Sequence, residues 1–267
     1  MKGRVLGLLA RKEWQPLWRF LHRVVERGLG FMNPDPRWNG EDRHLAGWAR
    51  ELQAQGCTRP VILDVGANEG DFAAGVLALL PDAEVHCFEP HPATGARLAG
   101  RFAADARVRV RRTGVGDRAG TIALYDYGGG DGTAHASFLG GVFTDIYRAA
   151  TDAVPVEVVT LDAYLAATGV ERVDLVKIDV EGYERHVLAG MAGALAAGRI
   201  GRVLFEFNAH NALIGFTLHQ LAQMLPEFDV YRLLANGLEP VAGRSTPYDA
   251  RVEVYAYANY VAVRRPA

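Results

Sequence analysis

A glycine-rich turn and a distant carboxylate together predict a nucleoside site. In DVGANEG (64–70), Gly66 and Gly70 lie on either side of Asn68. Gly66 allows a sharp turn after an apolar stretch, and Gly70 allows the backbone to approach a ligand closely. Glu89 follows Gly66 by 23 residues, and a carboxylate at that spacing is placed to accept hydrogen bonds from a ribose diol. The pattern predicts a nucleoside cofactor beyond the carboxyl ends of the strands.

The side chains of this turn favour one kind of nucleoside. A dinucleotide site needs a glycine in the middle of its G-x-G-x-x-G turn, where the pyrophosphate meets the helix N-terminus. That middle residue is Asn68, and Asp64 is expected to direct a carboxylate into the same loop. A carboxylate repels phosphate but can pair with an α-amino group. We therefore expect S-adenosylmethionine rather than NAD, which makes a Rossmann dehydrogenase the less favoured enzyme.

A second group of candidate residues lies in KIDVEGYE (177–184). On a strand, Lys177, Asp179 and Glu181 share one face, so Asp179 is expected at the C-terminal edge of the sheet. There Asp179 can orient the reactive end of the cofactor or bind the acceptor. Glu181 and Glu184 also resemble a helix-capping arrangement, which is the structural alternative for them.

Methyl transfer to a hydroxyl group needs a residue that assists departure of the hydroxyl proton. Two histidines are candidates, His210 just after a strand and His135 in a glycine-rich insertion, with a structural role as the alternative for each. Asp179, Glu206 and Asn208 could converge as oxygen ligands of a hard cation. Orientation of cofactor and substrate accounts for the same three residues, so no metal is predicted.

Six segments resemble the FkbM-type methyltransferases in their order and spacing. They are DVGANEGDF (64–72), FEPHP (88–92), VGDRAG (115–120), TLDAYL (160–165), KIDVEGYE (177–184) and LFEFN (204–208). The resemblance covers about 61–208 and implies the Rossmann-like seven-stranded methyltransferase fold, with transfer usually to a hydroxyl oxygen. The acceptors of this family vary widely, so a sugar, a polyketide, a peptide and a lipid-linked glycan all stay open.

The resemblance also implies which residues hold S-adenosylmethionine. Glu89 would bind the ribose. The methionine part and the adenine edge would be contacted by two further sets, Asp64, Gly66, Asn68 and Gly70 for the first, and Pro90, Val115 and Gly116 for the second.

The elements that must position these residues alternate from residue 61 onward. This alternation predicts an α/β fold with a mostly parallel sheet, helices on both faces and an antiparallel last strand. Strands are expected at 61–65, 84–88, 108–112, 121–127, 156–160, 173–179, 202–207, 229–234 and 252–263, and helices at 70–80, 92–103, 183–197 and 217–225. The methyltransferase domain is placed at 57–267.

Residues 1–56 are predicted to form an N-terminal helical arm with a second helix at 41–55. Apolar residues from Trp18 to Val25 recur at helical spacing, and 1–27 carries seven basic residues against two acidic ones. We interpret this arm as a docked or dimer-forming helix with a solvated basic face. Contact with anionic lipid or an acidic partner is the alternative.

The segment 128–147 combines glycines with Phe138, Phe143 and Tyr147. It is predicted to form a lid or wall over the acceptor, and a surface loop is the alternative.

The composition narrows the classes of protein to which this chain can belong. The 267 residues are 49% hydrophobic and 22% charged with a net charge of −2, which is ordinary for a globular protein and lacks the basic excess of nucleic-acid binders. Cys57 and Cys87 are expected to be free thiols in a reducing cytoplasm, and no apolar run approaches the ~20 residues of a membrane span. We expect a cytoplasmic methyltransferase acting on a small molecule, natural product or glycan. A catalytically inactive nucleoside-binding or scaffold protein is the alternative.

Overall fold

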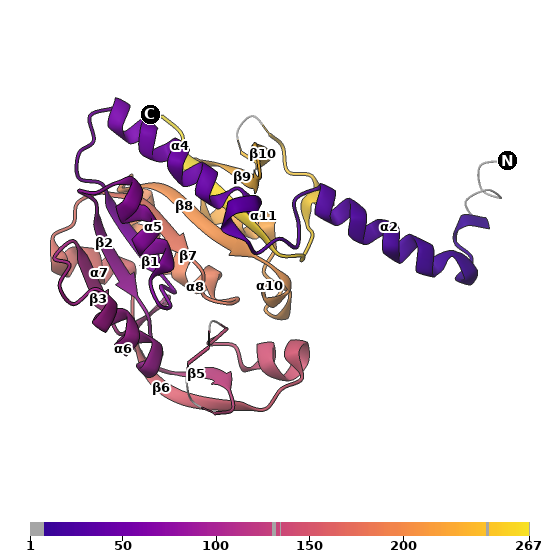
Figure 1. Cartoon of the computed structure of the whole chain (residues 1–267), viewed down its shortest axis with the longest axis horizontal. Helices are drawn as coiled ribbons and strands as arrows, with labels where there is room; N and C mark the ends of the chain where they lie inside the picture. The colour runs from indigo at the N-terminus through magenta and orange to yellow at the C-terminus, as the bar shows by residue number, and fades with distance from the viewer. Residues whose placement is uncertain (1–7, 130–131, 134, 244–245, 267) are drawn as a thin grey trace.

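The computed structural model describes residues 8–129, 132–133, 135–243 and 246–266, and in these it has two β-sheets (Figure 1). The large sheet has eight strands in the order β10-β9-β11-β8-β7-β1-β2-β3, and the small sheet has the order β4-β6-β5. The strands are β1 (Val61–Val65), β2 (Glu84–Phe88), β3 (Val108–Arg111), β4 (Gly114–Val115), β5 (Gly120–Tyr127), β6 (Thr151–Val159), β7 (Val173–Ile178), β8 (Ile200–Phe207), β9 (Phe228–Leu234), β10 (Gly237–Ala242) and β11 (Ala258–Arg264).

Helices cover both faces of the large sheet. One face packs against α7 (Leu161–Thr168), α8 (Glu184–Ala189), α9 (Ala192–Ala196) and α11 (Leu218–Met224). The other face packs against α4 (Glu41–Ala54), α5 (Asp71–Leu79) and α6 (Pro92–Arg101). The remaining short elements are η1 (Lys12–Trp14), α3 (Pro36–Asn39), η2 (Val142–Tyr147), α10 (Ala209–Leu213) and η3 (Ala250–Val252).

The predicted Rossmann-like architecture is confirmed. Strand β1 lies at the centre and runs parallel to β2 and β7, and nearly all of its VILDV residues are buried because helices cover both faces. Strand β11 pairs antiparallel with β8 and β9, as expected for the last strand.

Several predicted elements differ from the structure. Strand β6 starts at Thr151 and pairs antiparallel with β5 outside the large sheet, and the hairpin strand β10 was not predicted. The last strand covers only Ala258–Arg264 of the expected 252–263. The helix expected at 183–197 is broken into α8 and α9 at Gly190, where an added Cβ would lie 2.0 Å from the Gly116 carbonyl oxygen. That backbone contact leaves no room for an ordinary helical residue.

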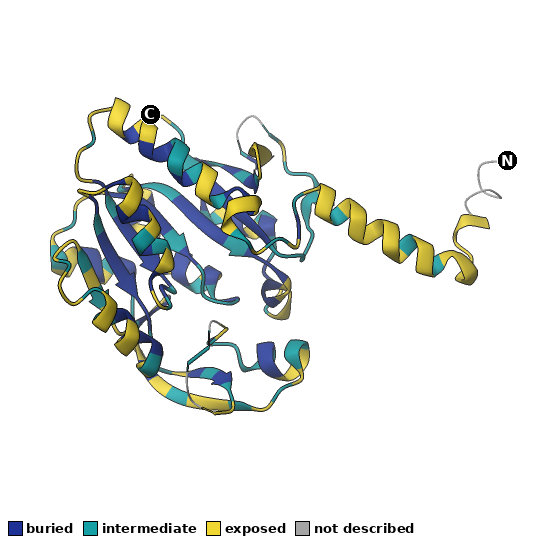
Figure 2. Ribbon diagram, in the orientation of Figure 1, coloured by how far each residue is buried: buried dark blue, intermediate teal, exposed yellow. Residues whose placement is uncertain are grey.

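The two helices of the predicted arm differ in their packing. Helix α4 contributes Leu45, Trp48 and Leu52 to the core beside β1, β7 and β8. Helix α2 (Gln15–Gly28) has no buried residue and projects from the body, so it is not docked on its own domain (Figures 1 and 2). Among the described residues, no helix has both the length and the apolar character needed to cross a bilayer.

Candidate active site

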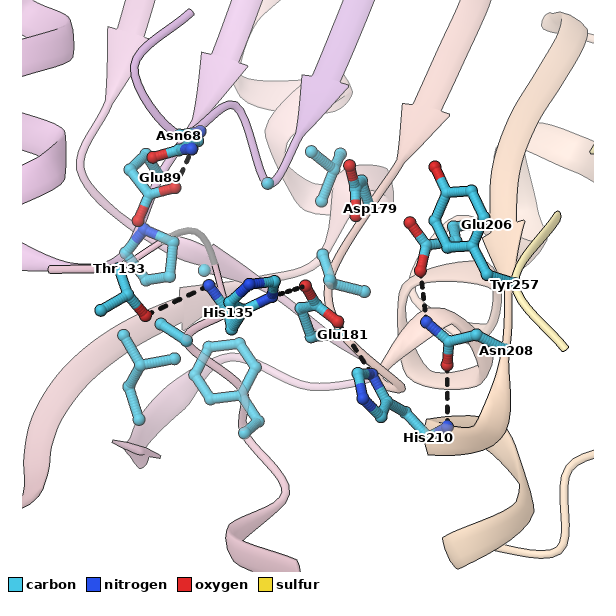
Figure 3. Close-up of a pocket in the computed structure, with 18 of the residues that line it drawn as sticks. Asn68, Glu89, Thr133, His135, Asp179, Glu181, Glu206, Asn208, His210 and Tyr257 are labelled. Atoms are coloured by element: carbon cyan, nitrogen blue, oxygen red, sulfur yellow. Dashed lines mark hydrogen bonds and ion pairs between the residues drawn. The ribbon is translucent and has the colours of Figure 1, made fainter. Parts of the chain in front are cut away.

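A cavity of about 550 Å³ lies at the carboxyl ends of the central strands. Val65, Glu89, Asp179 and Glu206 reach it from the ends of β1, β2, β7 and β8 (Figure 3). Open α/β sheets bind their ligands beyond the carboxyl ends of the strands, so the position agrees with the predicted site.

Glu89 lies at the centre of one side of the cavity (Figure 3). Its two carboxylate oxygens accept backbone N–H groups from Asn68 at 3.0 Å and His91 at 2.8 Å. Burial raises the pKa of Glu89 to about 7, although these two hydrogen bonds oppose the rise. Pro90 and Val115 line the same side of the cavity. A buried carboxylate fixed by two donors still has free lone pairs, so it can accept hydroxyl groups of a ligand.

The predicted glycines serve close packing in three different places. Gly66 lines the cavity with φ +82°, and an added Cβ would lie 1.7 Å from the Asp179 carbonyl oxygen. An added Cβ on Gly70 would instead meet Phe102 at 2.5 Å, and one on Gly116 would meet Val158 at 3.0 Å. Gly70 and Gly116 are not among the residues that line the cavity, and each packs against a neighbouring element.

Asp64 lies below the cavity rather than in it. Its side chain is fully buried, and neither carboxylate oxygen has a hydrogen-bond partner among the described residues. Burial raises the pKa of Asp64 to about 6. Lys177 Nζ lies 3.9 Å from Asp64 and 3.0 Å from Asp179 Oδ2, and only Asp179 of these two acids reaches the cavity. Burial opposes the charge on Lys177, but Asp179 and Asp64 outweigh it and raise the pKa of the ammonium.

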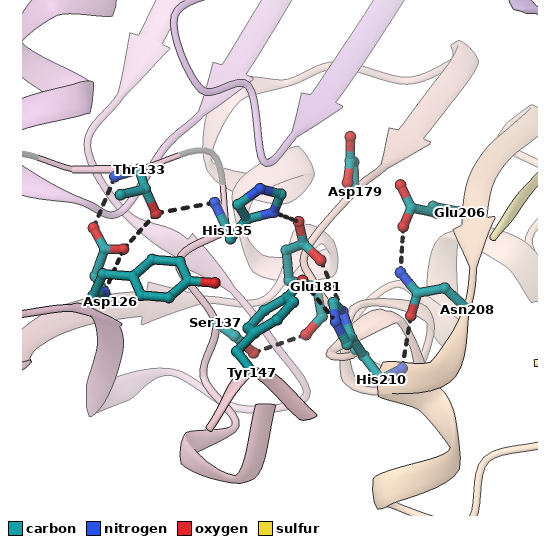
Figure 4. A network of polar contacts seen from close by, with 12 residues as sticks. Asp126, Thr133, His135, Ser137, Tyr147, Asp179, Glu181, Glu206, Asn208 and His210 are labelled. Atoms are coloured by element: carbon teal, nitrogen blue, oxygen red, sulfur yellow. Dashed lines mark hydrogen bonds and ion pairs between the residues drawn. The ribbon is translucent and has the colours of Figure 1, made fainter. Parts of the chain in front are cut away.

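A chain of four side chains forms the opposite side of the cavity (Figure 4). His135 Nδ1 lies 3.1 Å from Glu181 Oε1, and His210 Nδ1 lies 2.8 Å from Glu181 Oε2. The hydroxyl of Tyr147 then lies 3.1 Å from His210 Nε2. The structure thus joins both predicted histidines through Glu181, for which a helix-capping role was the alternative.

The four side chains of this group affect one another's pKa values. Burial alone would raise the pKa of Glu181, but the contacts with His135 and His210 outweigh it and lower the pKa. The hydrogen bond to Glu181 raises the pKa of His135. Burial, with a smaller contribution from Glu181, raises the pKa of Tyr147 to about 12. Glu181 is therefore ionised and Tyr147 protonated at neutral pH.

Glu206 and Asn208 lie beside this group of four side chains. The Asn208 amide donates to Glu206 Oε1, and its oxygen accepts the His210 N–H at 2.8 Å. Burial and the nearby acids Asp179 and Glu181 raise the pKa of Glu206 well above its usual value. No group of three or more His, Cys, Asp or Glu within the described part of the chain is placed to hold a metal ion. Asn208 is engaged in holding Glu206 and capping α10.

The segment 128–147 forms a wall of the cavity where the structure describes it. The segment contributes five residues to the lining of the cavity: Thr133, His135, Ala136, Phe138 and Tyr147. The ring of Phe138 lies 4.9 Å from that of Tyr183, and the Ser137 hydroxyl donates to the Glu181 carbonyl at 2.7 Å. Phe143 is fully buried behind the wall. Residues 130–131 and 134 of the predicted lid lie outside the described residues.

Part of the lining was not anticipated from the sequence. Met32, Pro34, Tyr255 and Tyr257 also face the cavity. Met32 N–H donates to the Tyr257 carbonyl at 2.8 Å, which joins the start and the end of the chain at this rim. None of these residues belongs to a motif, and only a fold that brings the chain ends together could have revealed them.

Comparisons with known proteins identify the family of this chain. Residues 64–233 match the Methyltransferase FkbM domain. The 2-O-methyltransferase NoeI of Sinorhizobium fredii is 30% identical over 189 residues, or 67% of this chain and 76% of that protein. The 31-O-demethyl-FK506 methyltransferase FkbM of Streptomyces tacrolimicus is 33% identical over 180 residues, or 58% and 68% of the two chains. Among solved structures, Aeropyrum pernix fibrillarin with bound S-adenosyl-L-methionine aligns at a TM-score of 0.39 with 13% identity, over 76% of this chain and 66% of that one.

The matched region includes the glycine-rich turn, Glu89 and the KIDVEGYE segment, which are the parts that build the cavity. It also spans well over half of the chain. The protein belongs to the FkbM family of S-adenosylmethionine-dependent methyltransferases.

Proposed function

We propose that the protein methylates a hydroxyl oxygen of a small polyhydroxylated acceptor, such as a glycan or a natural product. The observation that carries the proposal is the contact of His210 Nδ1 with Glu181. We assign the side of the cavity on which this contact lies, opposite Glu89, to the acceptor and call it the acceptor side. The two relatives are named for 2-O- and 31-O-methylation, which agrees with a hydroxyl acceptor.

The side of the cavity around Glu89 suits S-adenosylmethionine. When bound, this cofactor supplies an activated methyl group on a sulfonium centre. Glu89 would hold the ribose hydroxyls, while Pro90 and Val115 would border the adenine. Asp179 is the carboxylate exposed to the cavity, so it would pair with the amino group of the methionine part. Asp64 would act through Lys177, since its own side chain has no accessible surface.

His210 is proposed as the general base. Glu181 beside Nδ1 favours the tautomer with a proton on Nδ1, which leaves the lone pair of Nε2 as the proton acceptor, the position to which the Tyr147 hydroxyl now donates. The Tyr147 hydroxyl lies 3.1 Å from Nε2 and marks a position in which a hydroxyl group meets this nitrogen. His135 binds the other oxygen of Glu181 and is half exposed. We assign His135 to holding Glu181 in place.

The other acceptor-side residues suit a sugar-like molecule. Tyr255 and Tyr257 offer apolar ring faces, and Glu181 and Glu206 offer hydrogen-bond acceptors in the same cavity. Polyhydroxylated rings have both apolar faces and donor hydroxyl groups, so they match this combination.

The test compares histidine variants with labelled S-adenosylmethionine and a panel of oligosaccharide and polyketide alcohols. We expect His210→Ala to lower turnover by about 10²–10⁴-fold, as loss of a general base does, while S-adenosylhomocysteine affinity changes little. His135→Ala should shift the pH profile instead, because Glu181 loses one partner. His219→Ala is the matched control, since His219 lies on α11 and outside the cavity lining. Full turnover in His210→Ala would contradict the assignment.

A further inference from the structure

Helix α2 carries a broad apolar face with no buried residue. Five of its apolar side chains are 38–56% exposed, and a neighbouring tryptophan in η1 is 49% exposed. The members of this apolar face are Trp14, Leu17, Phe20, Leu21, Val24 and Val25. At 3.6 residues per turn, the arc from Phe20 to Val25 covers about 140° of the helix circumference. Figure 2 shows the helix as mostly exposed, with a few intermediate positions and none buried.

The opposite face of the same segment is basic. Lys12, Arg19, Arg23 and Arg27 are exposed and follow one another at intervals of seven, four and four residues, so they line one side of the helix. Only Glu13 and Glu26 oppose them between residues 8 and 29. The whole chain has a net charge of −2, so positive charge is concentrated in this arm.

We propose that α2 lies in the interface of an anionic lipid bilayer, with its apolar face in the acyl boundary and its arginines at the headgroups. Helices that adsorb to membranes combine a large apolar face containing Trp, Phe and Leu with a polar face rich in Lys and Arg. Aromatic side chains such as Trp14 and Phe20 favour the membrane–water boundary. Anionic lipid attracts the basic face, so the charges complement those of the bilayer surface.

A second copy of the chain matches this face less well. Pairing two α2 helices would bring two basic segments together. A coiled-coil seam needs three to four heptads and a narrow apolar stripe, whereas α2 has 14 residues and a broad one. On the described body, exposed large apolar residues such as Trp38, Leu79 and Leu238 lie on three different elements, α3, α5 and β10.

The arm is joined directly to the active-site cavity. Phe31 is buried with the Arg232 guanidinium 4.4 Å from its ring, and this anchors the chain just after α2. Met32 and Pro34, which follow at once, line the cavity. A helix adsorbed on a bilayer would therefore hold the cavity close to the membrane surface.

The test measures sedimentation of the full chain with vesicles of phosphatidylcholine and phosphatidylglycerol (3:1) against pure phosphatidylcholine. We expect binding to the anionic vesicles that weakens as salt is raised. Arg19→Gln/Arg23→Gln should lower that binding by about fivefold for each charge removed. Leu21→Glu should abolish it, while Leu238→Glu, an exposed apolar position on β10, should leave it unchanged.

Binding of S-adenosylhomocysteine by each variant reports folding without depending on membranes or on turnover. Equal sedimentation of wild type and Leu21→Glu would overturn the proposal, as would absence of binding to anionic vesicles. A dimer in light scattering that Leu21→Glu converts to a monomer, with no vesicle binding, would assign the face to a second copy and also overturn it.

Discussion

Affinity for the cofactor should depend on pH because of Glu89. This carboxyl group is 7% exposed, and burial raises its pKa to about 7. Ribose hydroxyl groups donate hydrogen bonds, and an ionised carboxylate accepts them more strongly than a protonated one. Binding should therefore favour the ionised form of Glu89 and release a proton at lower pH.

The size of the effect follows from the pKa. With a pKa of about 7, roughly one tenth of Glu89 is ionised at pH 6 and roughly nine tenths at pH 8. If the ionised form is the one that binds, affinity at pH 6 should be about tenfold lower than at pH 8, or about 1.4 kcal/mol. The folding stability of the free protein should depend on pH in the opposite direction. A pKa raised above the unfolded value gives stability that is present at low pH and lost as pH rises through 7.

Calorimetry with S-adenosylhomocysteine at pH 6, 7 and 8 measures this slope, and buffers of different ionisation heat count the protons released. In Glu89→Gln the affinity should be lower at pH 8 and nearly independent of pH. Glu157→Gln, which removes an exposed carboxylate on β6, should keep the wild-type slope. The reasoning is refuted if Glu89→Gln retains that slope, because the titrating group would then be another residue.

Three further outcomes are expected. Gly66→Ala should unfold the protein or destabilise it by about 3 kcal/mol or more, because its Cβ would overlap the Asp179 carbonyl. Gly75→Ala, at an exposed position of α5, should be neutral or stabilising in thermal melts. Excess chelator should leave turnover intact; loss restored by Mg²⁺ would make Asp179 and Glu206 metal ligands. Burial raises the pKa of Glu184 to about 8, so Glu184→Gln should gain Tm over wild type as pH rises from about 5 to 8, and a constant difference would contradict this.

The parts of the fold that depend on local pattern could be predicted from the sequence. Apolar runs such as VILDV (61–65) are long enough to identify buried parallel strands, and the turn at Gly66 follows from its glycine. The small sheet could not be predicted, because β5 and β6 are partly exposed and only their mutual register places them outside the main sheet. The break at Gly190 also depends on a distant contact, with the Gly116 backbone.

The candidate site was predicted in part for the same reason. Glu89, Asp179, His135 and His210 all line the cavity, since each follows a strand end or lies in the insertion that faces it. Asp64 illustrates the limit. Successive side chains on a strand point to opposite faces of the sheet. Val65 therefore lines the cavity, while the side chain of Asp64 points to the other face of the sheet and lies near Lys177.

Glu181 and Glu184 have different contacts, which explains why the two histidines meet one carboxylate at KIDVEGYE. Glu184 accepts the Gly182 N–H at 3.1 Å, so it satisfies the turn before α8 and takes over the local role expected of both acids. Glu181 adopts φ +52°, and Gly182 adopts φ +99°. An added Cβ at Gly182 would lie 2.9 Å from both His210 Cβ and the Leu139 side chain. Because that glycine lets the 128–147 wall and α10 close on the turn from two sides, His135 and His210 can reach the two oxygens of one carboxylate.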